Sequence, residues 1–238
     1  MKKALALVLA ALLLVSMAAC TGTAPAATTA ATTAAAAETT AAAETEATEA
    51  SAETESGKTY TVGICQLVQH PALDAATQGF KDALTEALGD AVSFNEQNAS
   101  GESVNCATIV NGLVASQVDL ILANATAPLQ AAASATADIP VLGTAVTDYA
   151  SALEIDNWTG TVGGNISGTS DLAPLDQQAA MLQELFPDAK TVGLLYCSAE
   201  SNSKYQVDMI RGYLEQAGLT CEEYAFTDTN DVASVTQK

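Results

Sequence analysis

Apolar runs suited to strands alternate with helical patterns through most of this chain. Short stretches rich in Val, Ile and Leu predict strands over 60–68, 118–123, 139–143 and 191–196. Further strands are predicted over 220–226 and, shorter, over 91–94. Between them, apolar residues recur three and four positions apart, which predicts helices over 73–88, 103–116, 128–136, 175–186 and 202–216. Strands joined by helices in this way call for parallel sheets covered on both faces.

One segment interrupts this rhythm. Residues 146–171 are rich in Gly, Thr and Asn and have no clear period. The sequence therefore predicts an α/β protein of two lobes: an N-terminal lobe over 58–148, a connecting segment over 149–171 and a second lobe over 172–238. The second lobe has two predicted strands and a helix that begins near Asp231, so we expect it to be incomplete.

The N-terminus has the pattern of a secretory signal. Lys2 and Lys3 precede an apolar run of about a dozen residues, which small residues separate from Cys20. A membrane-spanning helix needs roughly 20 apolar residues, so a signal peptide over 1–19 is predicted instead. Its end resembles the lipobox of bacterial lipoproteins, which implies cleavage before Cys20 and lipidation of the thiol. The alternative is an ordinary signal that ends near a cysteine.

Residues 20–57 are expected to be a linker that begins with the lipidated cysteine. The stretch consists almost entirely of Ala, Thr and Glu and has no large apolar side chain, so it cannot form a core. This composition predicts a flexible tether, and the alternative is a stalk with its own partner. The formal net charge of the whole chain is −20, which argues against nucleic acid and anionic membrane surfaces as partners.

Four cysteines lie within the predicted lobes: Cys65, Cys106, Cys197 and Cys221. Their spacing fits no zinc motif, and we expect neither a metal nor a cofactor. Export would permit disulfides, although buried free thiols are the simpler interpretation. Cys197 with Cys221 is the first pair to test, because both are expected on neighbouring strands.

Candidate binding residues follow from the topology. Ligands of open parallel sheets bind beyond the carboxyl ends of the strands, where helix N-termini offer free N–H groups and partial positive charge. Hydroxyls, amides and single acids at these places suit a small polar or zwitterionic solute. They are Gln66, His70, Asn124, Thr126, Thr144, Thr147, Asp148, Tyr196, Ser201, Asn202 and Ser203, with Ser170 and Asp171 at the end of a glycine-rich segment.

Several segments resemble the tryptophan/tyrosine-type substrate-binding lipoproteins of ABC importers. They are QLVQHPALD (66–74), VDLILA (118–123), IPVLGTAVTD (139–148), GGNISGTSD (163–171), TVGLLY (191–196) and ESNS (200–203). The resemblance runs in order from residue 60 to residue 238. It implies a type I periplasmic-binding-protein fold, in which two Rossmann-like lobes close on a ligand. Gln69 departs from the family, which usually has an acid there. The family's chain also continues past Lys238, so we expect a C-terminally truncated form.

The aromatic amino acids that the resemblance implies need a cation site and an anion site. Asp171 is the first candidate for the ammonium group and Asp148 the second; helix or turn capping is the alternative for each. Ser201, Asn202 and Ser203 are candidates for the carboxylate, or are simple N-caps. Tyr196 is a candidate for stacking on the ring. His70 is expected to line the cleft, or to be a helix-start residue fixed by the following proline.

The sequence thus predicts an extracytoplasmic solute-binding lipoprotein of an ABC importer. We expect a lipid anchor in the cell membrane, a permease subunit as partner, and Trp or Tyr as ligand. The alternatives are a sugar or nucleoside ligand on the same fold, or a non-transporting surface receptor or adhesin. Catalysis is not expected, because His70 is the sole histidine and no serine has a paired base.

Overall fold

The computed structural model describes residues 57–227 and 229–237. The predicted signal peptide, Cys20 and nearly all of the tether lie outside the described residues. The elements are β1 (Tyr60–Gln66), α1 (Pro71–Leu88), β2 (Val92–Asn98), α2 (Ser103–Ala115), β3 (Leu120–Asn124), α3 (Thr126–Ala135), β4 (Val141–Val146), α4 (Tyr149–Ala152), β5 (Ile166–Ser170), α5 (Leu175–Leu185), β6 (Thr191–Cys197), α6 (Ser201–Gln216), β7 (Thr220–Phe226) and α7 (Val232–Val235). None of the helices in these ranges is both long and apolar enough to cross a membrane.

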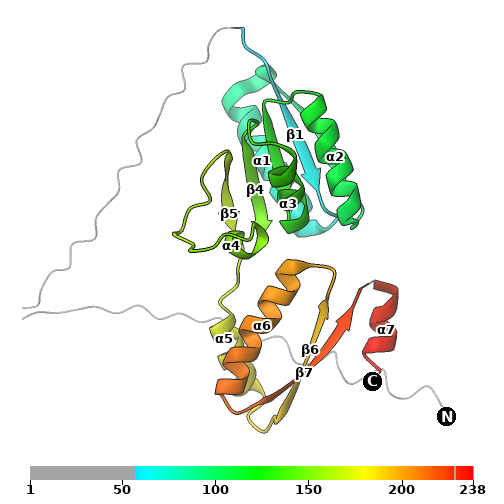
Figure 1. The fold of residues 1–238 in the computed structure, drawn as a ribbon, viewed down its shortest axis with the longest axis vertical. Coiled ribbons are helices and arrows are strands. Elements are labelled where there is room, and N and C mark those ends of the chain that lie inside the picture. The colour runs from blue at the N-terminus through cyan, green and yellow to red at the C-terminus, as the bar shows by residue number, and fades with distance from the viewer. Residues whose placement is uncertain (1–56, 228, 238) are drawn as a thin grey trace, which may run out of the picture. The chain divides into compact units, whose positions relative to one another are not determined.

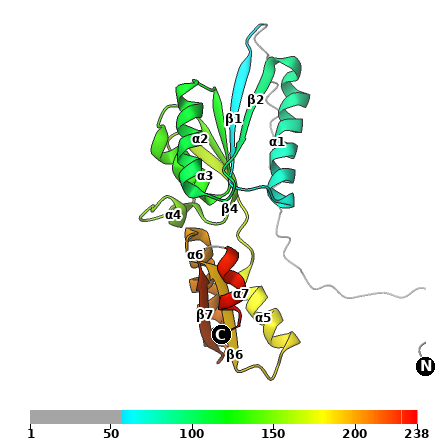
Figure 2. The same ribbon diagram turned by 90° about the vertical axis from the view of Figure 1, so that its right-hand side faces the viewer.

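The first lobe is a five-stranded parallel sheet in the order β2-β1-β3-β4-β5 (Figure 1). Helix α1 covers one face, and α2 and α3 cover the other (Figure 2). Successive residues of β1 face opposite layers. Val62 and Ile64 pack with Phe80 of α1, whereas Cys65 packs in the cluster that holds Leu113 of α2. Both faces of the sheet are therefore buried, as the apolar runs predict.

Strand β5 lies inside the segment that the sequence analysis assigned to an irregular connection. It pairs in parallel with β4 and completes the sheet of the first lobe. Most of its side chains are exposed, so it lacks the apolar run that marks the other strands. Its place depends on close contact: a Cβ added at Gly168 would lie 2.1 Å from both the Gly143 carbonyl oxygen and the Tyr149 hydroxyl oxygen.

The second lobe is built on the parallel pair β6 and β7. Leu194 of β6 packs against Val207 and Leu214 of α6 and Ala179 of α5. The α/β fold with two parallel sheets that the sequence predicts is confirmed. The second lobe looks incomplete, because its sheet has two strands in the described residues.

The suggested Cys197–Cys221 disulfide is not supported. The register pairs Cys197 with Phe226 and Cys221 with Val192, so the two cysteines lie at opposite ends of the strand pair. Five residues of strand separate them by about 16 Å, well beyond the reach of a disulfide. All four described cysteines are free thiols.

Candidate ligand-binding cleft

A cavity of about 1180 Å³ opens at the carboxyl ends of the strands. This is slightly larger than the ~300–1,000 Å³ typical of small-molecule sites. Its walls come from the loop after β1, the first turns of α2, α3 and α6, the end of β6 and the residues that follow β7. The cavity is thus where the parallel topology predicts a ligand.

Three helices of ten or more residues begin at this cleft without a side-chain cap. The N-cap residues of α2, α3 and α6 are Glu102, Ala125 and Glu200, and none of their side chains caps a backbone N–H of its helix. The first N–H groups of a helix have no partner within the helix and carry partial positive charge. The first turns of these helices line the cleft, so it offers several donors for an anionic group.

Thr126 combines burial, position and an unused hydroxyl. It is the first residue of α3, it lines the cleft, and only 4% of it is exposed. Among the described residues, no group bonds its hydroxyl. The preceding Ala125 has φ 101° and ψ 170°, a backbone region that residues other than glycine rarely occupy. Such strain is typically retained where a turn serves a site, which favours a ligand role for this turn.

Two carboxylates, Glu102 and Glu200, also line the cleft. The Glu200 carboxylate accepts a hydrogen bond of 2.8 Å from the Ser203 hydroxyl, which holds it beside the start of α6. The sequence analysis missed both acids, although each immediately precedes a predicted or observed helix. None of the residues that line the cleft is Lys, Arg or His. Helix N-termini beside carboxylates suit a molecule that carries both charges.

The apolar part of the wall includes Leu67, Leu195, Phe226 and the ring of Tyr196. The Tyr196 hydroxyl donates a 2.7 Å hydrogen bond to Glu223, which also pairs with Arg211. This bond anchors the polar end of Tyr196 and leaves its ring half-buried at the cleft. An aromatic or aliphatic group of a ligand would find dispersion contacts here.

Five of the predicted site residues lie together at the cleft. They are Thr126, Tyr196, Ser201, Asn202 and Ser203. A residue that the sequence analysis did not select, Gln130, lies with them, and its amide donates to the Ala152 carbonyl at 2.9 Å and to the Ser201 hydroxyl at 3.3 Å. Gln130 lies one turn inside α3. The sequence analysis considered polar residues at the carboxyl ends of strands and therefore did not select it.

Other predicted residues have contacts elsewhere. His70 Nδ1 accepts from the Ala72 amide and caps α1, and Asp148 accepts from the Ser151 amide at 2.7 Å and caps α4. The Ser170 hydroxyl donates to the carbonyl of Thr147. None of these four residues, nor Gln66, Asn124, Thr144 or Asp171, is among the residues that line the cleft. Their assignment to the ligand stays a prediction.

Tyr149 fixes the ends of β4 and β5 next to Asp171. Its hydroxyl donates to the Thr169 carbonyl at 3.3 Å. Burial, together with the charge of Asp171, raises the pKa of Tyr149 to about 12, so the phenol stays protonated as a donor. The two acids that the sequence analysis proposed for an ammonium group thus flank a buried, neutral tyrosine.

Two buried thiols adjoin each other in the core. Cys65 and Cys106 are both fully buried. The hydrogen bond with Cys106, reinforced by burial, raises the pKa of the Cys65 thiol far above its ordinary value, so Cys65 is uncharged and unreactive. In the described part of the chain, no group of His, Cys, Asp and Glu could hold a metal ion.

Comparisons with known proteins agree with this geometry. The sequence profile described as "ABC transporter substrate binding protein" matches residues 61–238. A tyrosine-binding protein of Clostridioides difficile is 37% identical over 183 residues, which cover 76% of this chain and 53% of that protein. This chain therefore spans about half the length of that relative.

Solved structures give the same result. The ABC domain of a Streptococcus pneumonia protein in complex with L-Trp is 39% identical, with a TM-score of 0.70 over 75% of this chain and 61% of that one. A ligand-free, open substrate-binding protein with adhesive properties from Clostridium difficile is 38% identical, with a TM-score of 0.53 over 74% and 60% of the two chains. The type I periplasmic-binding-protein fold and the likeness to ABC substrate-binding proteins expected from the sequence are confirmed. The chain belongs to the family of ABC transporter substrate-binding proteins.

Proposed function

We propose that this protein is the solute receptor of an ABC importer and binds an aromatic amino acid, Trp or Tyr, in the cleft. The observation that carries the proposal is the cleft itself, where three uncapped helix N-termini adjoin two carboxylates and an apolar wall. A free amino acid has the matching anion, cation and side chain. The tyrosine-binding relative and the L-Trp complex support the same ligand class.

Each part of the ligand has candidate partners. The starts of α3 and α6, with Thr126 and residues 201–203, are proposed for the carboxylate. Glu102 and Glu200, which line the cleft, are proposed for the ammonium group, with Asp171 as the other candidate; the Asp148 carboxylate instead caps α4. The apolar wall around Leu195 is proposed for the ring. Neutral donors can orient a charged ligand while they cost little desolvation themselves.

The whole protein is proposed to act outside the cytoplasm and without catalysis. The signal pattern and Cys20 support export and a lipid anchor. Family membership supports a permease subunit as partner. Binding without turnover fits the cleft, which has no histidine and no Lys or Arg in its lining.

A second candidate function is adhesion at the cell surface. One specific observation favours it: the 38%-identical protein from Clostridium difficile is described as a substrate-binding protein with adhesive properties. The two functions are compatible, since that protein is described as having both. Loss of cell attachment in a strain that lacks this protein, with solute uptake intact, would favour adhesion as the main function.

Calorimetric titration of the chain tests the proposed ligand. L-Trp and L-Tyr are expected to bind, whereas tryptamine, which lacks the carboxylate, and indole-3-propionate, which lacks the ammonium group, are each expected to bind at least about tenfold more weakly. A hydrogen bond to a charged group is worth about 1.5–3 kcal/mol, which gives a change of this size. Ribose is the negative control. Binding of ribose without binding of either amino acid would reject the proposed ligand.

A further inference from the structure

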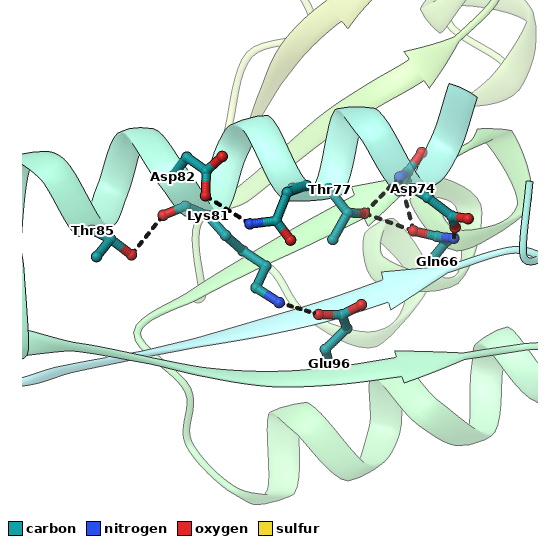
Figure 3. A network of polar contacts seen from close by, with 9 residues as sticks. Gln66, Asp74, Thr77, Lys81, Asp82, Thr85 and Glu96 are labelled. Atoms are coloured by element: carbon teal, nitrogen blue, oxygen red, sulfur yellow. Dashed lines mark hydrogen bonds and ion pairs between the residues drawn. The ribbon is translucent and has the colours of Figure 1, made fainter. Parts of the chain in front are cut away.

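A buried polar cluster lies between α1 and the end of β1 (Figure 3). Gln66, Thr77 and Asn124 come from β1, α1 and β3, and they are 4%, 3% and 0% exposed. The Thr77 hydroxyl donates to Gln66 Oε1 at 2.7 Å and accepts from Asn124 Nδ2 at 2.8 Å. Its single proton thereby fixes the orientation of both amides.

This cluster is bonded directly to the cleft rim. Gln66 Nε2 donates to the Val68 carbonyl at 2.9 Å and to the Asp74 carboxylate at 2.6 Å. The Leu67 amide donates to the Asn124 carbonyl at 3.2 Å, and the Gly101 amide donates to the Leu67 carbonyl at 2.8 Å. Leu67, Val68 and Gly101 all line the cleft. Movement of the Gln66 amide would therefore disturb the rim directly, and Asn124 acts on it through Thr77 and Gln66.

The cluster is costly as a purely structural feature. Polar groups in a core stabilise a protein less than apolar side chains of the same shape unless every donor and acceptor is paired. Asn124 Oδ1 is buried and has no partner, so the pairing is incomplete. A cluster that gives up stability in this way, and that bonds a binding surface, fits a positioning role.

We propose that Thr77, with Gln66, Asp74 and Asn124, positions the Leu67–Val68 rim of the cleft for the ligand. None of these four side chains needs to touch the solute. The part of the inference that concerns ligand affinity rests on the proposed function. The part that concerns the rim itself does not.

Two pairs of variants of the full chain test this role. Thr77→Val removes the central hydroxyl, and Thr85→Val is its control on the same helix, because the exposed Thr85 hydroxyl donates only to the Lys81 carbonyl. Asp74→Ala removes the exposed end of the cluster and is expected to fold in any case. Asp82→Ala is its control, because that exposed carboxylate accepts only from Gln78. Thr77→Ser is the rescue variant.

Amide hydrogen exchange reports the rim without any ligand. In Thr77→Val, exchange at Leu67 and Gly101 is expected to rise roughly threefold to tenfold more than at Leu122 in the core strand β3, as the loss of about one hydrogen bond predicts. Asp74→Ala is expected to give a smaller rise at the same amides. Thr77→Ser and both controls are expected to stay within about twofold of the wild type.

Affinity for L-Trp and L-Tyr is the second readout. Thr77→Val is expected to weaken both roughly threefold to tenfold under conditions where the protein is folded, and Thr77→Ser to restore them. Equal exchange at rim and core amides in Thr77→Val and Asp74→Ala overturns the positioning role, and so does unchanged affinity in Thr77→Val. If the wild type binds neither amino acid, the proposed function fails, while the exchange ratio still decides the positioning role.

Discussion

At the scale of single residues, close contacts explain where small side chains are required. Gly143 and Gly168 face each other across β4 and β5, with the hydroxyl of Tyr149 between them: a Cβ at Gly143 would lie 2.4 Å from that hydroxyl oxygen. The tyrosine in turn donates to Thr169. The two glycines make room for a buried polar side chain that holds the fifth strand in place.

Gly168→Ala is therefore expected to destabilise the fold by at least about 2 kcal/mol, because overpacking a tight contact forces the backbone to shift. The unfolding free energy in urea measures this. Gly212→Ala is the matched control: Gly212 lies within α6 with nothing near its Cβ position, so alanine is expected to stabilise by up to about 1 kcal/mol. Equal stability of the two variants would refute the tight packing of β5.

At the scale of elements, helix starts differ in how their N–H groups are satisfied. His70 and Asp148 cap α1 and α4, and neither residue lines the cleft. Helices α2, α3 and α6 open onto the cleft without such caps. Helix α5 also lacks a side-chain cap and does not line the cleft, so a missing cap alone does not mark the site. The site is marked instead by the convergence of several uncapped helix starts on one cavity.

Asp148 offers a test that separates capping from ligand binding. Asp148→Asn keeps a good N-cap, so stability is expected to change by less than about 0.5 kcal/mol, whereas Asp148→Ala is expected to lose about 1 kcal/mol. Affinity for L-Trp in Asp148→Asn is expected to stay within about twofold, because the carboxylate is committed to the Ser151 amide. A large loss of affinity with unchanged stability would instead support the ammonium contact predicted from the sequence.

At the scale of the whole molecule, attachment to the membrane is expected to depend on one cysteine. The described helices include no membrane span, and the proposed anchor is the lipid on Cys20. A lipid chain holds a protein at a bilayer through its buried methylene groups and needs no spanning helix. The acidic chain, with a net charge of −20, would gain nothing from an anionic bilayer surface.

Cys20→Ser is expected to abolish incorporation of labelled palmitate and to release the protein from the membrane fraction. Cys197→Ser serves as the control, because that thiol lies in β6 and is expected to have no part in anchoring. Fractionation of bacteria that express each variant gives the answer. Continued labelling of Cys20→Ser would show that the lipid is attached elsewhere, or that the signal is an ordinary one.

Sequence alone determined most of the scaffold. Runs of Val, Ile and Leu in β1, β3 and β4 are buried on both faces, and burial imposes an apolar pattern that can be read directly. Strand β5 was not predicted from the sequence, because its side chains are mostly exposed and its pairing depends on a backbone contact at Gly168. The polar second half of β2, residues 95–98, escaped prediction for the same reason.

Only the tertiary structure decided which polar residues at the strand ends face the cleft. Sequence placed Thr126, Gln66 and Asn124 alike beyond or at strand ends, because parallel strands all end at one edge of the sheet. Thr126 lines the cavity, whereas Gln66 and Asn124 bond to Thr77 beneath the rim. Side-chain direction depends on which neighbour supplies a hydrogen-bond partner, and those neighbours come from distant parts of the chain.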